Sequence, residues 1–299
     1  MSRCPSATVV IVTRDRPTML EAVLRLLREQ SYAEHEVVVV DTSYAGTARP
    51  AALAMGTRYM SAPRVTLGAA RQAGVRVAAG EIVAFTDDDC LPRPDWLEAL
   101  VVTLRDLPDL LGVRGATVAE IGPVGAHAVR VDRPDPLYHT CNIAYRRDAV
   151  QRAGGFDSGF VRWFEDTALA ARVLRLGPIG WQPRAVVMHR ALPRRPLDRS
   201  GWATLLADER RLATDYPDFY RRYRGPGFVP TVVIRWLLGS PLKTLARDLA
   251  RAPEDPGGYG RLALLLLRER VALLAALLTR RPGVSGQDPC APSTFPHGG

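Results

Sequence analysis

The sequence is almost free of lysine, and this scarcity narrows the classes of molecule that the protein can be expected to bind. Of its 40 lysine and arginine residues only Lys243 is a lysine, and with 31 acidic residues the formal net charge is +9. A basic balance suits nucleic acid, anionic lipid or a phosphorylated substrate. The chain has no lysine-rich block and no basic stripe interleaved with aromatic side chains, so we expect no nucleic-acid partner.

Cysteines are few, and long hydrophobic runs are missing. The four cysteines, Cys4, Cys90, Cys141 and Cys290, stand too far apart for a metal knuckle or a CxxC redox pair. We expect unpaired thiols of a cytoplasmic protein. The N-terminus lacks the charged-then-apolar pattern of a signal peptide, and no run of about 18 apolar residues predicts a spanning helix.

Apolar strands alternate with helices in the first half of the chain. The runs TVVIVT (8–13), EVVVVD (36–41) and IVAFT (82–86) are typical of strands buried on both faces. Apolar residues at helical spacing follow Pro17, and the sequence also predicts helices over 67–79 and 94–106. Weaker patterns predict strands at 58–62, 140–146 and 185–189 and a helix over 165–176. This alternation predicts an α/β fold with a doubly wound parallel sheet, whose ligand lies at the carboxyl ends of the strands.

The domain organisation follows from a change of composition near residue 225. We predict one domain over 1–224, with a nucleotide-binding half (1–109) and an acceptor half (110–224). Residues 225–281 are predicted to form a helical appendage and 282–299 a disordered tail. The apolar runs of the appendage are broken by arginines, which suits a lid packed on the domain or an element lying on an anionic membrane surface. Both interpretations stay open.

Three adjacent carboxylates follow the strand IVAFT. Asp87, Asp88 and Asp89 repel one another, and such a run favours a hard cation such as Mg²⁺ or Mn²⁺. Alternation along an extended segment would place Asp87 and Asp89 on one side. The alternative is a solvated acidic turn that begins the next helix.

Other charged residues stand at predicted element ends. Glu165 and Asp166 open a predicted helix, where an ionised carboxylate suits a general base, although acids in a first turn also simply stabilise helices. Arg71 follows small residues and suits a diphosphate contact, against the alternative of a surface arginine. His189 ends a strand and suits a metal or phosphate contact, or a structural role.

Taken in order, these segments resemble the family 2 glycosyltransferases of GT-A fold. The similar segments cover roughly residues 7–190 and are VVIVTRDRP, VVVVDTS, LGAARQAGVRVAAGEIVAFTDDDCLP, CNIAYRRDAVQRAGGFD and FEDTALAARVLRLG. The resemblance implies a mixed, mostly parallel sheet. It also implies metal-assisted transfer of a sugar from a nucleotide-diphosphate donor to an acceptor hydroxyl, with inversion at the anomeric carbon.

The resemblance also implies roles for single residues. Asp166 corresponds to the catalytic base, with Glu165 beside it, and Asp89 to the metal-binding acid of a DxD motif. From its place at the end of a strand, and not from the resemblance, we predict His189 as a further metal ligand. The nucleotide-binding residues would be Thr13, Arg14, Asp15, Asp41, Arg71, Asp87 and Asp88. Of these, Asp41 would contact the base and Asp87 the ribose. Cys141 and Asn142 would line the cleft for the donor sugar and acceptor.

Two departures leave the donor undefined. Thr42-Ser43-Tyr44 stands where the family often has an acid-containing turn, and Gln72 stands where an asparagine is usual. The expected partners are a nucleotide-diphospho-sugar and a hydroxyl-bearing acceptor, for which a lipid-linked molecule and a secondary metabolite both fit. If the appendage binds lipid, the protein would act at the inner face of the membrane.

Three other functions compete with this interpretation. A nucleotidyltransferase would carry a glycine-rich loop after its first strand, and TRDRP contains no glycine. A catalytically inactive, membrane-associated assembly subunit would be expected to lose an acid, but Asp87, Asp89 and Asp166 are present. A processive synthase would need a QxxRW motif, and Gly159 and Val232 stand where its glutamine should be.

Overall fold

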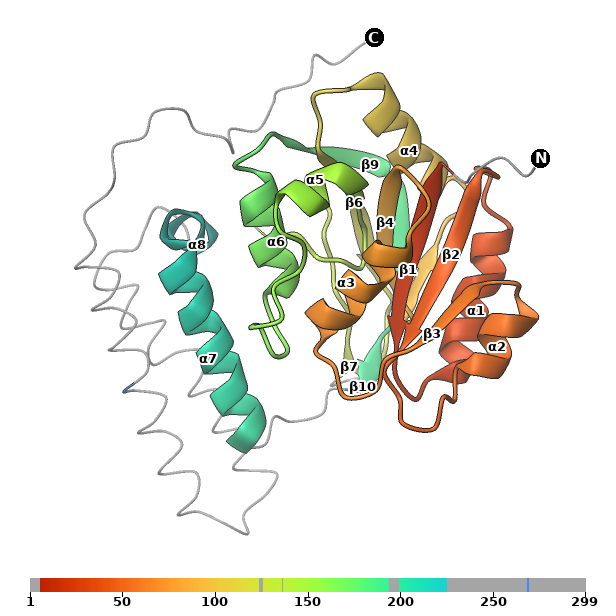
Figure 1. Ribbon diagram of the computed structural model, residues 1–299, viewed down its shortest axis with the longest axis horizontal. Helices are drawn as coiled ribbons and strands as arrows, with labels where there is room; N and C mark the ends of the chain where they lie inside the picture. Colours follow the sequence, from red (N-terminus) through yellow and green to blue (C-terminus); the bar gives the residue numbers. More distant parts are fainter. Residues whose placement is uncertain (1–5, 124–125, 136, 194–198, 225–267, 269–299) are drawn as a thin grey trace. The chain divides into compact units, whose positions relative to one another are not determined.

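A computed structural model describes residues 6–123, 126–135, 137–193, 199–224 and 268 (Figure 1). Contacts divide the chain into two compact units. The described residues of the first unit are those up to 159 and from 165 to 193, and those of the second are 160–164, 199–224 and 268. Except for Arg268, the appendage and tail predicted for 225–299 lie outside the described residues.

The first unit is built around an eight-stranded sheet in the order β3-β2-β1-β4-β8-β6-β9-β5. Its strands are β1 (Ala7–Thr13), β2 (His35–Asp41), β3 (Arg58–Ser61), β4 (Ile82–Asp87), β5 (Cys90–Pro92), β6 (Gly112–Ala119), β8 (Ile143–Arg146) and β9 (Ile179–His189). Its helices are α1 (Pro17–Arg28), α2 (Arg49–Ala54), α3 (Leu67–Val77), α4 (Trp96–Asp106), α5 (Arg147–Arg152) and α6 (Glu165–Val173). A small pair joins β7 (Ala126–His127) to β10 (Leu192–Pro193).

The sheet is mixed and mostly parallel, as predicted. Strands β3, β2, β1 and β4 run parallel to one another, and β6 runs parallel to β9. Strand β8 is antiparallel to both β4 and β6, and β5 is antiparallel to β9. Because β1 lies between β2 and β4, the chain winds outward on both sides of β1, and a crevice is expected at the carboxyl ends of these three strands.

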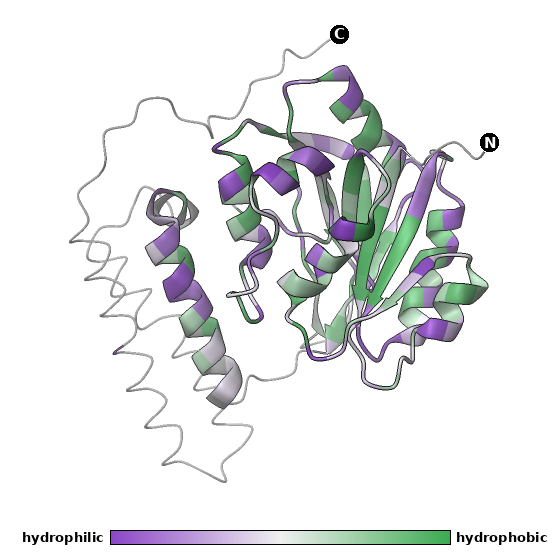
Figure 2. Cartoon of the chain, in the orientation of Figure 1, coloured by the Kyte–Doolittle hydropathy of each residue, from purple (hydrophilic) through white to green (hydrophobic). Residues whose placement is uncertain are grey.

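Apolar residues cover both faces of the central strands, which Figure 2 shows as hydrophobic. Val9 and Ile11 are buried in the cluster that includes the inward faces of α1 and α4. Val10 points to the opposite face, where α3 packs. A Cβ atom on Gly74 of α3 would lie 2.5 Å from Val10 Cγ1, so glycine allows the helix to approach the strand this closely.

Two strands of the second half differ from the sequence prediction. Strand β6 was not predicted, and β9 begins at Ile179 rather than Ala185. Their register shifts after the pair Gly115–Gln182, since Ala116 pairs with Val186. This irregularity accommodates Pro183, which cannot donate a ladder hydrogen bond. A Cβ on Gly115 would lie 1.9 Å from the Ala185 carbonyl oxygen, so this position requires glycine.

The described part of the second unit contains α7 (Arg199–Asp215), α8 (Pro217–Arg224) and the loop 160–164. The buried carboxylate of Asp208 on α7 accepts hydrogen bonds from three successive loop amides: those of Val161, Arg162 and Trp163, at 3.0, 2.9 and 3.0 Å. Three charge-assisted bonds fix this loop on α7. Across the described residues, no helix is both long and apolar enough to cross a membrane.

Replacing Asp208 with asparagine should loosen the loop 160–164. Asparagine keeps one acceptor oxygen and directs an NH₂ donor at an N–H group, so at least one loop amide loses its partner. We expect a loss of about 2 kcal/mol or more in unfolding free energy, measured in urea, together with faster hydrogen exchange at residues 161–163. Asp215→Asn, at an exposed Arg211 pair on the same helix, is the control. Unchanged exchange at 161–163 would contradict this prediction.

Candidate active site

Charged and polar residues meet where the three central parallel strands end. Thr13 ends β1, Asp41 ends β2 and Asp87 ends β4, and Asp88 and Asp89 follow in a turn before β5. The predicted nucleotide-binding and metal-binding acids therefore lie at the edge of the sheet where a crevice is expected.

The turn after β4 separates the three acids into two groups. The Thr13 hydroxyl donates to Asp88 Oδ2 at 2.7 Å. Arg16 Nη1 contacts Asp88 Oδ1 and Asp89 Oδ2, both at 3.0 Å. Asp87 points elsewhere, toward Arg71. The expected alternation, with Asp87 and Asp89 on one side, does not apply because Asp88 and Asp89 form a turn rather than an extended segment.

Burial changes the pKa values of the charged groups at this turn. It raises the pKa of the Asp88 carboxyl to about 6, although the hydrogen bond from Thr13 and the charge of Arg16 oppose the rise. Burial alone would lower the pKa of Arg16, but Asp88 and Asp89 outweigh it and hold the pKa above its usual value. Arg16 is therefore a permanent positive charge against two acids that repel each other.

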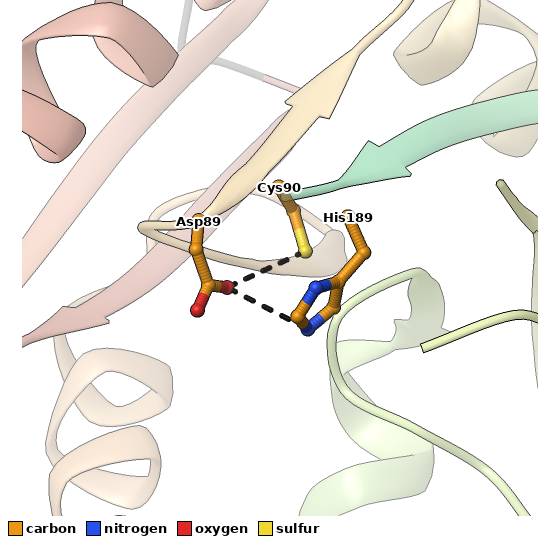
Figure 3. Close-up of side chains that lie close together, drawn as sticks. All are labelled: Asp89, Cys90 and His189. Carbon is orange, nitrogen blue, oxygen red and sulfur yellow. Dashed lines mark hydrogen bonds and ion pairs between the residues drawn. The ribbon is translucent and has the colours of Figure 1, made fainter. Parts of the chain in front are cut away.

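Figure 3 shows a cluster that could hold a metal ion: Asp89, Cys90 and His189, brought together by the turn, β5 and the end of β9. One ligand atom from each lies within 4.8 Å of the others. Asp89 Oδ1 is 3.8 Å from His189 Nε2 and 3.8 Å from Cys90 Sγ. The pairing of Cys90 with His189 between β5 and β9 produces this arrangement.

The oxygen and nitrogen donors of this cluster fit a hard divalent cation. His189 Nδ1 lies 3.0 Å from the Arg190 carbonyl oxygen, which can only accept, so Nδ1 carries the proton. In the tautomer with its only proton on Nδ1, the ring presents the lone pair of Nε2 toward Asp89, as a metal ligand requires. Cys90 fits less well: its contact with Cys141 and its burial raise the thiol pKa well above the usual value, and Mg²⁺ and Mn²⁺ prefer oxygen ligands.

Arg71 joins helix α6 to Asp87, the last residue of β4 before the acidic turn of Asp88 and Asp89. Its buried guanidinium forms an ion pair with Glu165 and contacts Asp87 Oδ1 at 3.1 Å. Burial by itself would lower the pKa of Arg71, but Asp87 and Glu165 raise it above its usual range. The predicted donor-side acid and the predicted base motif thus lie on either side of one arginine, 16 and 94 residues away from it in sequence.

Glu165 and Asp166 occupy different environments at the start of α6. Glu165 is 4% exposed, and burial together with the charge of Asp166 raises its pKa to about 7 against the opposing effect of Arg71. Asp166 is partly exposed, and its Oδ2 accepts only a long bond, 3.3 Å, from the Thr140 amide. Its Oδ1 accepts from the Thr167 amide and hydroxyl. Of the two acids, Asp166 offers the more available oxygen.

The remaining residues that we predicted to bind the nucleotide differ widely in their exposure to solvent. Asp41 is fully buried, and its oxygens accept from the amides of Ser43 and Ala48 and from the Tyr59 hydroxyl. Because the side chain has no exposed surface, a nucleotide base could reach it only if the surrounding residues moved. Arg14 and Asp15 lie in the loop after β1 with side chains 64% and 63% exposed. Asp15 adopts a positive φ of 54°, which turns the chain into α1.

The two residues predicted to line the sugar cleft are buried. The Asn142 amide accepts from Trp96 Nε1 at 2.8 Å and donates to the carbonyl oxygens of Ala116 and Ala185 at 2.7 and 2.9 Å. Cys141 contacts the Thr117 hydroxyl. With every polar atom of its side chain engaged, Asn142 positions β6, β9 and α4 rather than offering a group to a cleft.

Part of this site lies in a region that matches a known protein family. The model for "Glycosyl transferase family 2" matches residues 8–154, which include most of β1, the acidic turn and β8. Just under half of the chain is thus similar to glycosyl transferase family 2.

Two curated relatives come from Haloferax volcanii (strain ATCC 29605). One is a glucosyl-dolichyl phosphate glucuronosyltransferase, 30% identical over 108 residues, which are 29% of this chain and 33% of that protein. The other is glycosyltransferase AglE, 26% identical over 185 residues, which are 54% of this chain and 61% of that protein. The matches therefore span between about a third and three fifths of these two relatives.

Among solved structures, the chain is similar to the mannosyltransferase PcManGT from Pyrobaculum calidifontis, in complex with GDP-Man and Mn²⁺. The TM-score is 0.58 at 20% identity, and the match covers 93% of this chain and 88% of that one. At this identity the similarity establishes the fold, which is GT-A.

Sequence reasoning missed Arg16 and Cys90 as residues of the site. Arg16 lies in the quoted segment TRDRP, but only the fold shows that it reaches acids 72 and 73 residues later. Cys90 directly follows the acidic run, and its partner His189 became visible only with the antiparallel pairing of β5 and β9. The raised Asp88 pKa had a signal in the sequence, since three adjacent acids following a buried strand cannot all be solvated.

Proposed function

We propose that this chain transfers a sugar from a nucleotide-diphosphate donor to an acceptor hydroxyl with inversion at the anomeric carbon. The observation that carries the proposal is the buried Arg71, which contacts Asp87 on the donor side and Glu165 in the base motif. Through these contacts Arg71 holds the start of α6 next to the end of β4. A displacement requires the donor and the acceptor to be held close together in this way.

Asp166 is the proposed general base. It would accept the proton of the acceptor hydroxyl as that oxygen attacks the anomeric carbon and the bond to the diphosphate breaks. Its partial exposure supports this role. Glu165 is buried against Arg71 and holds the start of α6 in place. One carboxylate acting as base permits a single displacement, which inverts the anomeric centre.

Asp89 and His189 are the residues that would hold a divalent cation, Mg²⁺ or Mn²⁺. When bound, such an ion supplies positive charge that offsets the charge gained by the departing diphosphate. The Nδ1 contact of His189 with the Arg190 carbonyl oxygen, which leaves Nε2 for a metal, and the hard oxygens of Asp89 support the assignment. The Mn²⁺ and GDP-Man named with PcManGT also support a metal and a nucleotide-sugar for this fold.

The proposed donor is a nucleotide-diphospho-sugar and the proposed acceptor bears a hydroxyl group. The name of the Haloferax glucosyl-dolichyl phosphate glucuronosyltransferase supports a lipid-linked acceptor. Contact with a membrane surface stays a prediction, because the arginine-interrupted segments that suggested it lie almost entirely outside the described residues.

A thermal-shift panel of nucleoside diphosphates with and without Mn²⁺ tests this function. At a hundredfold excess over its dissociation constant, a ligand stabilises the folded state by about 2.7 kcal/mol. We therefore expect one nucleotide with Mn²⁺ to raise the melting temperature by about 5 °C or more, and by much less in EDTA. The responding base would identify the donor class. No response to any nucleoside diphosphate, with or without Mn²⁺, would contradict the proposal.

A further inference from the structure

Arg16 is placed on the same carboxylate that would bind the cation. It stands at the N-cap of α1, where its own side chain makes no capping bond. Its Nη1 lies 3.0 Å from Asp89 Oδ2, while Asp89 Oδ1 faces His189 and Cys90. The two oxygens of one carboxylate are thus divided between a guanidinium and the candidate metal cluster.

Asp88 holds the Arg16 guanidinium in place. Asp88 Oδ1 also contacts Nη1 at 3.0 Å, and the second oxygen of Asp88 is held by the Thr13 hydroxyl. Asp88 is therefore a fixed support for the arginine. The Arg16 side chain is nevertheless 44% exposed, whereas those of Asp88 and Asp89 are 6% and 11% exposed. Of these three side chains, the guanidinium is therefore the one that a ligand arriving from solvent meets first.

We propose that Arg16 shares Asp89 with the divalent cation and sets its affinity, and that the guanidinium released from Asp89 binds the diphosphate of the donor. The inference rests on the proposed function. A cation bound by Asp89 lowers the negative charge that holds Arg16, so the contact of Arg16 with Asp89 Oδ2 weakens. Arginine geometry suits two phosphate oxygens at once. Arg16 would thus link metal binding to diphosphate binding.

Binding measurements on the full chain test this without turnover. Mn²⁺ binding is followed by electron paramagnetic resonance in the absence of nucleotide. Arg16→Gln should bind Mn²⁺ at least about fivefold more tightly than wild type does, since a competing ion pair is removed. With Mn²⁺ saturating, the affinity of the same variant for a nucleoside diphosphate should fall by about tenfold, the loss of a charge-assisted contact. Arg16→Lys should retain the competition for Asp89 and only part of the diphosphate affinity.

The control is Arg93→Gln, which removes an exposed arginine just after β5 that pairs with Asp95 rather than with the acidic turn. It should leave both affinities unchanged. Equal Mn²⁺ affinity in wild type and Arg16→Gln, with Mn²⁺ bound by both, would overturn the inference and leave the proposed function standing. Wild-type protein that binds no Mn²⁺ would overturn the metal assignment and the inference together.

Discussion

Replacing Asp166 with asparagine should slow sugar transfer by about 10²–10⁴-fold, the usual contribution of general-base catalysis. The substitution keeps the size of the side chain and an acceptor oxygen, but it removes the group that takes the hydroxyl proton. Because Asp166 lies outside the acidic turn, nucleotide and Mn²⁺ binding should stay near wild type. Product anomers and single-turnover rates provide the measurement.

Asp148→Asn is the matched control for this experiment. Asp148 also stands in the first turn of a helix, α5, but it is exposed and pairs with Arg152. It should transfer sugar at the wild-type rate. An Asp166→Asn enzyme within about threefold of wild type, against the expected minimum of about a hundredfold, would assign the base to another residue. A product with retained configuration would exclude the single displacement.

The second large effect is expected at Asp89. Asp89→Asn removes the hard anionic ligand of the candidate cluster and leaves Arg16 paired with Asp88 alone. Charge stabilisation by a bound cation is worth several kcal/mol in the transition state, so transfer should fall by about 10²-fold or more. Mn²⁺ binding should weaken in parallel, while the fold persists because a crowded acid has been neutralised.

Asp95→Asn serves as its control, since Asp95 is an acid a few residues further on that contacts only Arg93 among the described ion pairs. Its Mn²⁺ affinity and transfer rate should be those of wild type. Excess EDTA should reproduce the effect of Asp89→Asn in the unmodified enzyme. Full transfer in EDTA would remove the metal from the proposal and leave the base assignment untouched.

The strands that position the site were predictable because they are unbroken apolar runs. TVVIVT, EVVVVD and IVAFT lie within β1, β2 and β4, and their carboxyl ends carry Thr13, Asp41 and Asp87. Strand β6 escaped prediction because its sequence GVRGATVA contains two glycines and an arginine. The start of β9 was hidden by Gly180 and Pro183, which normally argue against a strand. Helices α2 and α5 have six residues each, too few to show a helical period.

The composition of the site was easier to predict than its contacts. A run of acids after a buried strand favours a cation, against the alternative of a solvated turn. Nothing in the sequence indicates that the side chains of Asp41 and Asn142 form hydrogen bonds with neighbouring backbone groups. The same holds for Arg71 and Glu165, which lie 94 residues apart. Such contacts depend on how the strands are ordered and on their register, which local patterns do not contain.

The Arg71 bridge constrains how this enzyme can be redesigned. Removing Arg71 would leave Glu165 buried without its counter-ion, and removing Glu165 would leave a buried guanidinium paired only with the partly exposed Asp87. Single substitutions at these three positions should therefore fail even where a combination succeeds. A library aimed at new donor specificity should vary residues 71, 87 and 165 jointly, with total charge held constant, and leave the acids at 88 and 89 for separate rounds.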